Sequence, residues 1–69
     1  MLIARLIAEP ATLQDSIARA RADLSVRGME LESDALLAAV PGVLELRISG
    51  GNAGSARAVL DTIFAPSDL

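Results

Sequence analysis

The chain has 69 residues, a length typical of one small domain with a thin hydrophobic core. It contains no Cys and no His, which excludes a disulfide framework, a zinc site built from those ligands, a thiolate nucleophile and an imidazole base. A net charge of -3 and a single aromatic residue, Phe64, argue against nucleic acid, and no apolar run approaches the ~20 residues that span a membrane. We therefore expect one cytoplasmic domain over residues 1–69, with no nucleic-acid or membrane partner.

The start of the chain is typical of a strand. Residues 2–9 are dense in Leu and Ile and end at Pro10. Because side chains alternate along a strand, Ile3, Arg5 and Ile7 are expected to share one face and the even-numbered residues the other.

An amphipathic helix is expected next. Apolar residues recur at helical spacing from Leu13 to Leu24, and Gly28 supplies the left-handed residue that commonly ends a helix. Thr12 stands three residues before Asp15, which predicts a capping box at the start of this helix.

Two further strands follow in the central part of the chain. Apolar and polar residues alternate over residues 29–32 and again over residues 44–48, with Pro41-Gly42 as the turn before the second run. The composition of residues 34–40 allows either a short helix or a continued strand, and their place in a hairpin favours the strand.

A second helix closes the pattern. The glycine-rich residues 50–55 end the strand pattern. After them, apolar residues recur at helical spacing from Ala56 to Phe64, and Pro66 follows. The order strand, helix, strand, strand, helix predicts an α+β, ferredoxin-like βαββα(β) sandwich, with two helices on one face of an antiparallel sheet. Its last strand would begin at Pro66–Leu69 and is incomplete.

The glycine-rich loop before the second helix is a candidate binding site. Backbone N–H groups at a helix start attract anions, and the candidate residues are Gly51, Asn52, Gly54 and Ser55. The loop lacks the Lys-Ser/Thr ending of a phosphate-binding P-loop. An ordinary loop in which Asn52 or Ser55 caps the helix explains the same residues and is favoured.

The carboxylates of the two central strands are a candidate acid/base or metal cluster. Glu30, Glu32, Asp34 and Glu45 are close enough in a hairpin to meet. Strand alternation explains them more simply, as solvated or partner-facing residues whose charge Arg5 and Arg47 balance, and this interpretation is favoured. We therefore assign no catalytic residue and no metal ligand.

The sheet face opposite the helices is the most informative surface. Apolar residues ringed by charges indicate an interface. The residues expected there are Ile3, Arg5, Ile7, Val43, Glu45 and Arg47. Scattered apolar residues with no role remain the alternative interpretation.

Two segments carry a resemblance to a known family. Residues 2–10, "LIARLIAEP", resemble the "ATLIANP"-type opening of bacterial phosphoserine phosphatases, whose long forms begin with an ACT-like domain. Residues 55–69, "SARAVLDTIFAPSDL", resemble the helix and the short following strand that lead into the haloacid-dehalogenase-type catalytic domain of those enzymes. The resemblance implies an ACT-like variant of the ferredoxin-like fold.

The resemblance also implies a parent enzyme in serine biosynthesis, a hydrolase that converts L-phosphoserine to L-serine and phosphate with an Asp nucleophile and Mg²⁺. The nucleophile segment and the Mg²⁺ carboxylates of that family have no counterpart in these residues, so no cofactor is expected in this chain. ACT domains bind amino-acid effectors near the first turn, often at a Gly, which makes Glu9, Thr12 and Gly28 candidates. Glu9-Pro10-Ala11-Thr12 lacks that Gly, which favours docking or dimerisation over effector binding.

The expected function is therefore a non-catalytic regulatory or dimerisation domain of a phosphoserine phosphatase. The expected partners are a second copy of the chain or a covalently attached catalytic domain, with an amino-acid effector in a regulatory role. Two alternatives stay open: a stand-alone module that binds a small molecule or amino acid, and a structural dimerisation domain unrelated to serine metabolism.

Overall fold

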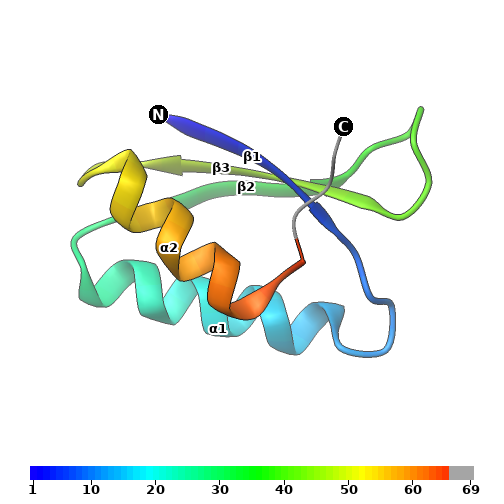
Figure 1. The fold of residues 1–69 in the computed structure, drawn as a ribbon, viewed down its shortest axis with the longest axis horizontal. Coiled ribbons are helices and arrows are strands. Elements are labelled where there is room, and N and C mark those ends of the chain that lie inside the picture. Colours follow the sequence, from blue (N-terminus) through cyan, green and yellow to red (C-terminus); the bar gives the residue numbers. More distant parts are fainter. Residues whose placement is uncertain (66–69) are drawn as a thin grey trace.

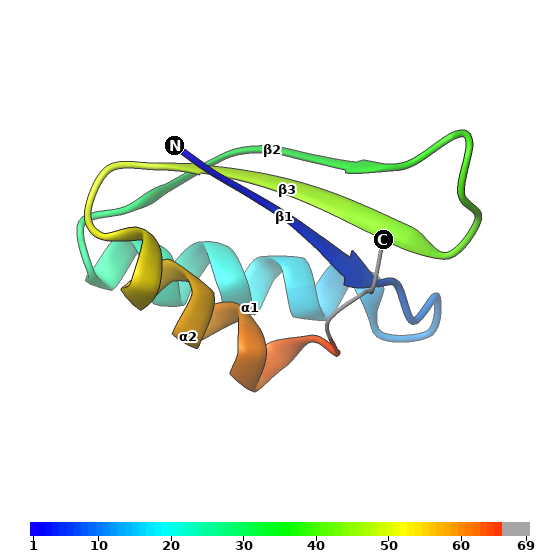
Figure 2. The same cartoon turned by 45° about the horizontal axis from the view of Figure 1, so that its top comes forward.

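A computed structural model describes residues 1–65 as a three-stranded antiparallel sheet with two helices packed on one of its faces (Figures 1 and 2). The elements in chain order are β1 (Leu2–Ile7), α1 (Leu13–Val26), β2 (Glu30–Leu36), β3 (Val43–Ser49) and α2 (Ala53–Ile63). The strand order is β1-β3-β2. This arrangement confirms the predicted α+β class and the ferredoxin-like βαββα order, whereas the strand predicted to begin at Pro66–Leu69 lies outside the described residues.

The pairing of β1 with β3 determines which side chains face the helices. Ala4 lies opposite Leu46 and Leu6 lies opposite Leu44, and each of these four side chains is at most 1% exposed. Since side chains alternate along a strand, the odd-numbered residues of β1 lie on the face away from the helices, as the sequence predicted.

The core lies between the sheet and the two helices and is entirely apolar. No polar or charged side chain of the described residues is buried. The core side chains are Ala4, Leu6, Ile17, Ala20, Leu24, Met29, Leu31, Leu44, Leu46, Ile48, Ala56, Val59, Leu60 and Phe64. In so small a domain, each fully buried Leu or Ile contributes ~1.5–3 kcal/mol, so losing one is a large fraction of the total stability.

Two of the helix ends have the capping residues that the sequence predicts, and a third does not. Gly28 ends α1 in the left-handed region with φ 75°, and Asn52 caps α2. The capping box predicted at Thr12 was wrong, because its side chain makes no capping hydrogen bond. Thr12 has φ -118° and ψ 4° in a turn closed by its own N–H, which donates to the Glu9 carbonyl, rather than the extended backbone of a side-chain cap.

The ambiguous segment over residues 34–40 divides between strand and loop. β2 continues through Leu36, and the Leu37 N–H donates to the Val43 carbonyl at 2.9 Å before the chain turns back into β3. The hairpin position therefore outweighed the helix propensity of the Ala and Leu residues. Within residues 1–65, neither helix has the length and apolar character needed to cross a membrane.

Candidate functional site

The side of the sheet that carries no helix is the candidate site, and we call it the outer face. Figure 2 shows both helices on the opposite side of the sheet. The outer face is defined by Ile3, Arg5 and Ile7 of β1 and by Glu45 and Arg47 of β3. Ile3 is 51% exposed and Ile7 is 41% exposed, so two large apolar side chains border the charged residues.

A carboxylate between two guanidinium groups forms the centre of the outer face. Glu45 lies opposite Arg5 in the sheet, and Arg5 Nε is 3.5 Å from Glu45 Oε2. Arg47 is two residues further along β3, hence on the same face, and its Nε is 3.3 Å from Glu45 Oε1. The Glu45 side chain is 16% exposed. Two arginines and one glutamate leave this row with a net positive charge between the two isoleucines.

Val43 does not belong to this exposed surface, contrary to the sequence expectation. Its register places it on the same side as Glu45, but only 5% of it is exposed. Ile7 lies opposite it in β1, and Leu37 follows β2 on its other side, where its N–H bonds to the Val43 carbonyl. Neighbours on both sides explain how an outward-facing residue is buried.

In the candidate anion-binding loop, the Asn52 side chain accepts the hydrogen bonds of backbone N–H groups at the start of α2. Asn52 Oδ1 accepts hydrogen bonds from the Gly54 N–H at 2.7 Å and from the Ser55 N–H at 3.2 Å. These are two of the N–H groups that an anion at this helix start would need. The arrangement therefore favours the interpretation of an ordinary capped helix, with Asn52 rather than Ser55 as the cap.

The glycines before Asn52 are explained by close packing. Gly50 and Gly51 both have positive φ, at 79° and 57°. A Cβ on Gly50 would stand 2.9 Å from the Gly28 carbonyl oxygen, and one on Gly51 would stand 2.5 Å from Met29 Cγ. The loop thus crosses directly over the turn that ends α1, and a side chain at either position would collide with it.

The other candidate ligand residues, Glu9 and Thr12, lie at the opposite end of the domain. Figure 1 shows the β1–α1 loop at one end of α1, and the turn between α1 and β2 together with the β3–α2 loop at the other end. Since α1 has 14 residues, these ends are about 20 Å apart. The structure brings Gly28 beside Gly50, in the same loop as Gly51, but does not bring Glu9 and Thr12 there, so the candidates do not form one site.

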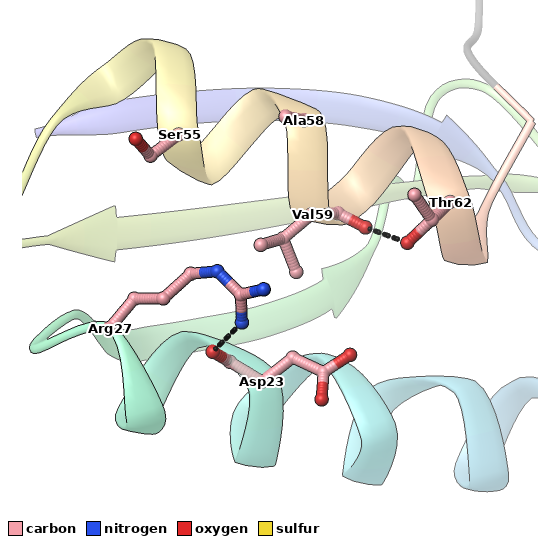
Figure 3. A pocket seen from close by; sticks show the side chains of 6 residues that line it. All are labelled: Asp23, Arg27, Ser55, Ala58, Val59 and Thr62. Carbon is pink, nitrogen blue, oxygen red and sulfur yellow. Dashed lines mark hydrogen bonds between the residues drawn. The ribbon is translucent and has the colours of Figure 1, made fainter.

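A groove between α1 and α2 was missed by the sequence reasoning. It has a volume of about 290 Å³ and is lined by Asp23, Arg27, Ser55, Ala58, Val59 and Thr62. Figure 3 shows the Arg27 side chain extended between the helices, where its Nη1 donates to the Asp23 carbonyl at 2.9 Å. Only helix packing brings these residues together, so no spacing in the sequence indicated the groove. Its two charged residues have opposite signs, which gives no preference for an anion or a cation.

The strand carboxylates are dispersed among different partners rather than paired with one another. Glu32 accepts a hydrogen bond from the Ser49 hydroxyl, and Asp34 forms an ion pair with Arg21 of α1, with 3.2 Å between Nη2 and Oδ2. In the described part of the chain, no three His, Cys, Asp or Glu residues gather as a metal-binding group. The favoured interpretation of these carboxylates as surface residues agrees with this geometry.

Comparison with protein-family models, with curated proteins and with solved structures gave no match for this chain. The assignment of function therefore depends on the surface described above. The fold and the site define a small α+β domain in which the helices cover one face of the sheet and leave the other face uncovered.

Proposed function

We propose that this chain is a non-catalytic accessory domain that makes dimer or interdomain contacts through the uncovered side of its sheet. The observation that carries the proposal is the outer face, where exposed Ile3 and Ile7 border the ion-paired Arg5–Glu45–Arg47 row. Apolar side chains provide the area that binding removes from water, and the ion-pair row gives a contact its orientation. A regulatory or assembly role fits such a surface better than a reaction does.

The parent protein in this proposal is a cytoplasmic phosphoserine phosphatase with its Mg²⁺ site in a separate catalytic domain. The support is the resemblance of residues 2–10 and 55–69 to the N-terminal domains of those enzymes, together with the strand and helix order. An amino-acid effector is less well supported, because Glu9 and Thr12 lie far from the glycine-rich loop.

Two experiments test this proposal in turn. The coding sequence after Leu69 is expected to continue in frame into a segment with the aspartate nucleophile of the phosphatase family, and a stop codon there contradicts the proposed parent. Removal of residues 1–69 from the complete gene product is then expected to leave hydrolysis of L-phosphoserine with Mg²⁺ intact and to lower the oligomeric state or abolish a response to L-serine.

The deletion also has a result that contradicts the accessory role. If the shortened protein is folded by circular dichroism and yet hydrolyses no phosphoserine, the domain takes part in the reaction. If oligomeric state, serine response and activity are all unchanged, the domain makes no functional contact within that protein.

A further inference from the structure

The two edges of the sheet differ in whether another strand can add to them. At the outer edge of β1, the Ile7 N–H donates to the Ala65 carbonyl at 2.9 Å, and the ferredoxin-like order places its last strand at this same edge. Within residues 1–65, β2 pairs only with β3. The outer edge of β2 is therefore the edge at which another chain can extend the sheet.

The first half of the β2 edge is protected against such pairing. A bulge between Leu31 and Ser33 interrupts its register, and Glu30 and Glu32 place negative charge there. Bulges and charges are features by which proteins block an edge strand. The outward carbonyl of Leu31 is also occupied, because it accepts a hydrogen bond from Arg21 Nη1 of α1 at 3.3 Å. Strand addition is therefore restricted to the part of β2 that follows the bulge.

Backbone hydrogen bonds show that this second half has free outward groups. The Leu37 N–H donates to the Val43 carbonyl of β3 at 2.9 Å. Because the direction alternates along an antiparallel strand, the backbone groups of Ala35 point toward β3, and those of Asp34 and Leu36 point away from it. Within residues 1–65, no backbone hydrogen bond uses these outward groups of Asp34 and Leu36.

The side chains around these free groups are apolar and exposed. Residues 35–44 contain no charged residue, and Leu36 is 58% exposed. The nearest charge is that of Asp34, which lies opposite buried Leu46 and forms an ion pair with Arg21 at 3.2 Å. An apolar strand edge without charged residues is the kind of edge that pairs with another chain.

We propose that a second copy of this chain pairs with the second half of the β2 edge, in antiparallel orientation, about a two-fold axis through Ala35. Asp34 of each copy lies opposite Leu36 of the other, and each such pair exchanges both N–H···O=C bonds. The two sheets become one continuous sheet, with both outer faces open on the same side. The inference goes beyond the proposed function, because it uses a surface separate from the outer face. A two-fold pairing is closed, so it stops at a dimer.

The register follows from the charges and from the groups that are free. A pairing centred on Asp34 would set the two Asp34 carboxylates against each other. A pairing centred on Leu36 would place Asp34 opposite Ala38, which lies beyond the end of β2. Centring the axis on Ala35 uses the outward groups of both Asp34 and Leu36, and each Asp34 then faces an uncharged residue and keeps Arg21 as its counter-ion.

Charge exchange at Ala35 tests the two-fold axis, because the axis brings this residue of both copies together. Ala35→Lys sets two cations side by side across the axis, whereas within one chain the new amine lies opposite Glu45, so the fold is retained. Ala35→Glu sets two carboxylates there. We expect each variant alone to stay monomeric in analytical ultracentrifugation at concentrations where the wild type dimerises, and an equimolar mixture of the two to dimerise. The control Ala35→Gln has similar bulk without charge and is expected to keep the dimer.

A second comparison tests the backbone hydrogen bonds. Leu36→Pro removes the outward N–H, which the β2–β3 ladder does not use, so the fold is retained while the dimer loses a hydrogen bond in each copy. The matched control Leu36→Ala loses the same side chain but keeps the N–H. We expect the dimer dissociation constant of Leu36→Pro to be about tenfold higher than that of Leu36→Ala.

The wild-type chain decides the matter even if these variants fail to fold by circular dichroism. Its amide shifts on dilution from millimolar to micromolar concentration are expected to change at Asp34 and Leu36. A chain that stays monomeric at millimolar concentration overturns the inference, as do unchanged amides at these two residues in a dimer. A mixture of Ala35→Lys and Ala35→Glu that dimerises no better than either variant alone also overturns it.

A failure of this inference is distinguishable from a failure of the proposed function. If Ile3→Lys abolishes the dimer and Ala35→Lys leaves it intact, the copies associate through the outer face. The β2 pairing is then wrong, while the proposed contact role of the outer face stands. The deletion experiment on the accessory role is independent of both variants.

Discussion

Removing the charge of Glu45 is expected to destabilise the domain, because the two ion pairs on the outer face are lost. Glu45→Gln keeps the size of the side chain but eliminates both ion pairs and leaves Arg5 and Arg47 as neighbouring like charges. The two arginine side chains are 49% and 51% exposed, so water screens both pairs. At ~0.2–1 kcal/mol for an exposed pair, the two together contribute about 1 kcal/mol.

Thermal unfolding followed by far-ultraviolet circular dichroism measures this effect. For a domain of this size, a loss of about 1 kcal/mol lowers the Tm by about 4–8 °C. Wild type and variant are compared at one protein concentration, because association would make the Tm concentration-dependent. In high salt the Debye length falls to about 3 Å, so the difference between the two proteins is expected to shrink.

The control for Glu45→Gln is Glu30→Gln, the same substitution on the neighbouring strand β2. Residues 1–65 provide no ion-pair partner for Glu30, so its Tm is expected to change little. An equal Tm loss for both variants would refute the reasoning, as would a loss at Glu45 that is the same in low and high salt, because packing rather than charge would then be its cause.

Two further substitutions test the core and the loop by urea unfolding. Leu46→Ala, at a fully buried position of the central strand, is expected to cost ~2–5 kcal/mol, whereas Leu36→Ala, at a residue 58% exposed, is expected to cost less than about 1 kcal/mol. Similar losses at both sites would contradict the assigned core. Asn52→Ala removes the acceptor for two backbone N–H groups and is expected to cost about 1 kcal/mol, against a much smaller change for Ser55→Ala. A larger loss for Ser55→Ala would mean that the cap is assigned to the wrong residue.

The fold was largely predictable because its signals are local. Alternation placed Ala4 and Leu6 inside and Ile3 outside, and helical spacing located both helices. Gly28 was identified, and the cap of α2 was narrowed to Asn52 or Ser55, from chemistry that is nearly independent of context, namely left-handed backbone and a short side-chain acceptor.

The errors came from contacts that depend on the path of the chain. Thr12 matched a capping box in sequence, but the turn that precedes α1 set its backbone in a conformation that does not place the hydroxyl as a cap. Val43 was assigned to the correct face, yet its exposure depends on Ile7 and Leu37, whose proximity follows from the hairpin register. The groove at Arg27 depends on how two helices pack, which spacing along one chain does not reveal.

The most direct test of the account is to map which amides respond when the chain associates. Amide chemical shifts measured by ¹H–¹⁵N correlation across a dilution series report the contact surface residue by residue. We predict concentration-dependent shifts at Ile3 and Arg5, spreading to Arg47, with none at Ala18 or Val26 on the exposed side of α1. Shifts that cluster at Ala18 and Val26 while β1 stays unchanged would contradict the claim that this domain works through the uncovered side of its sheet.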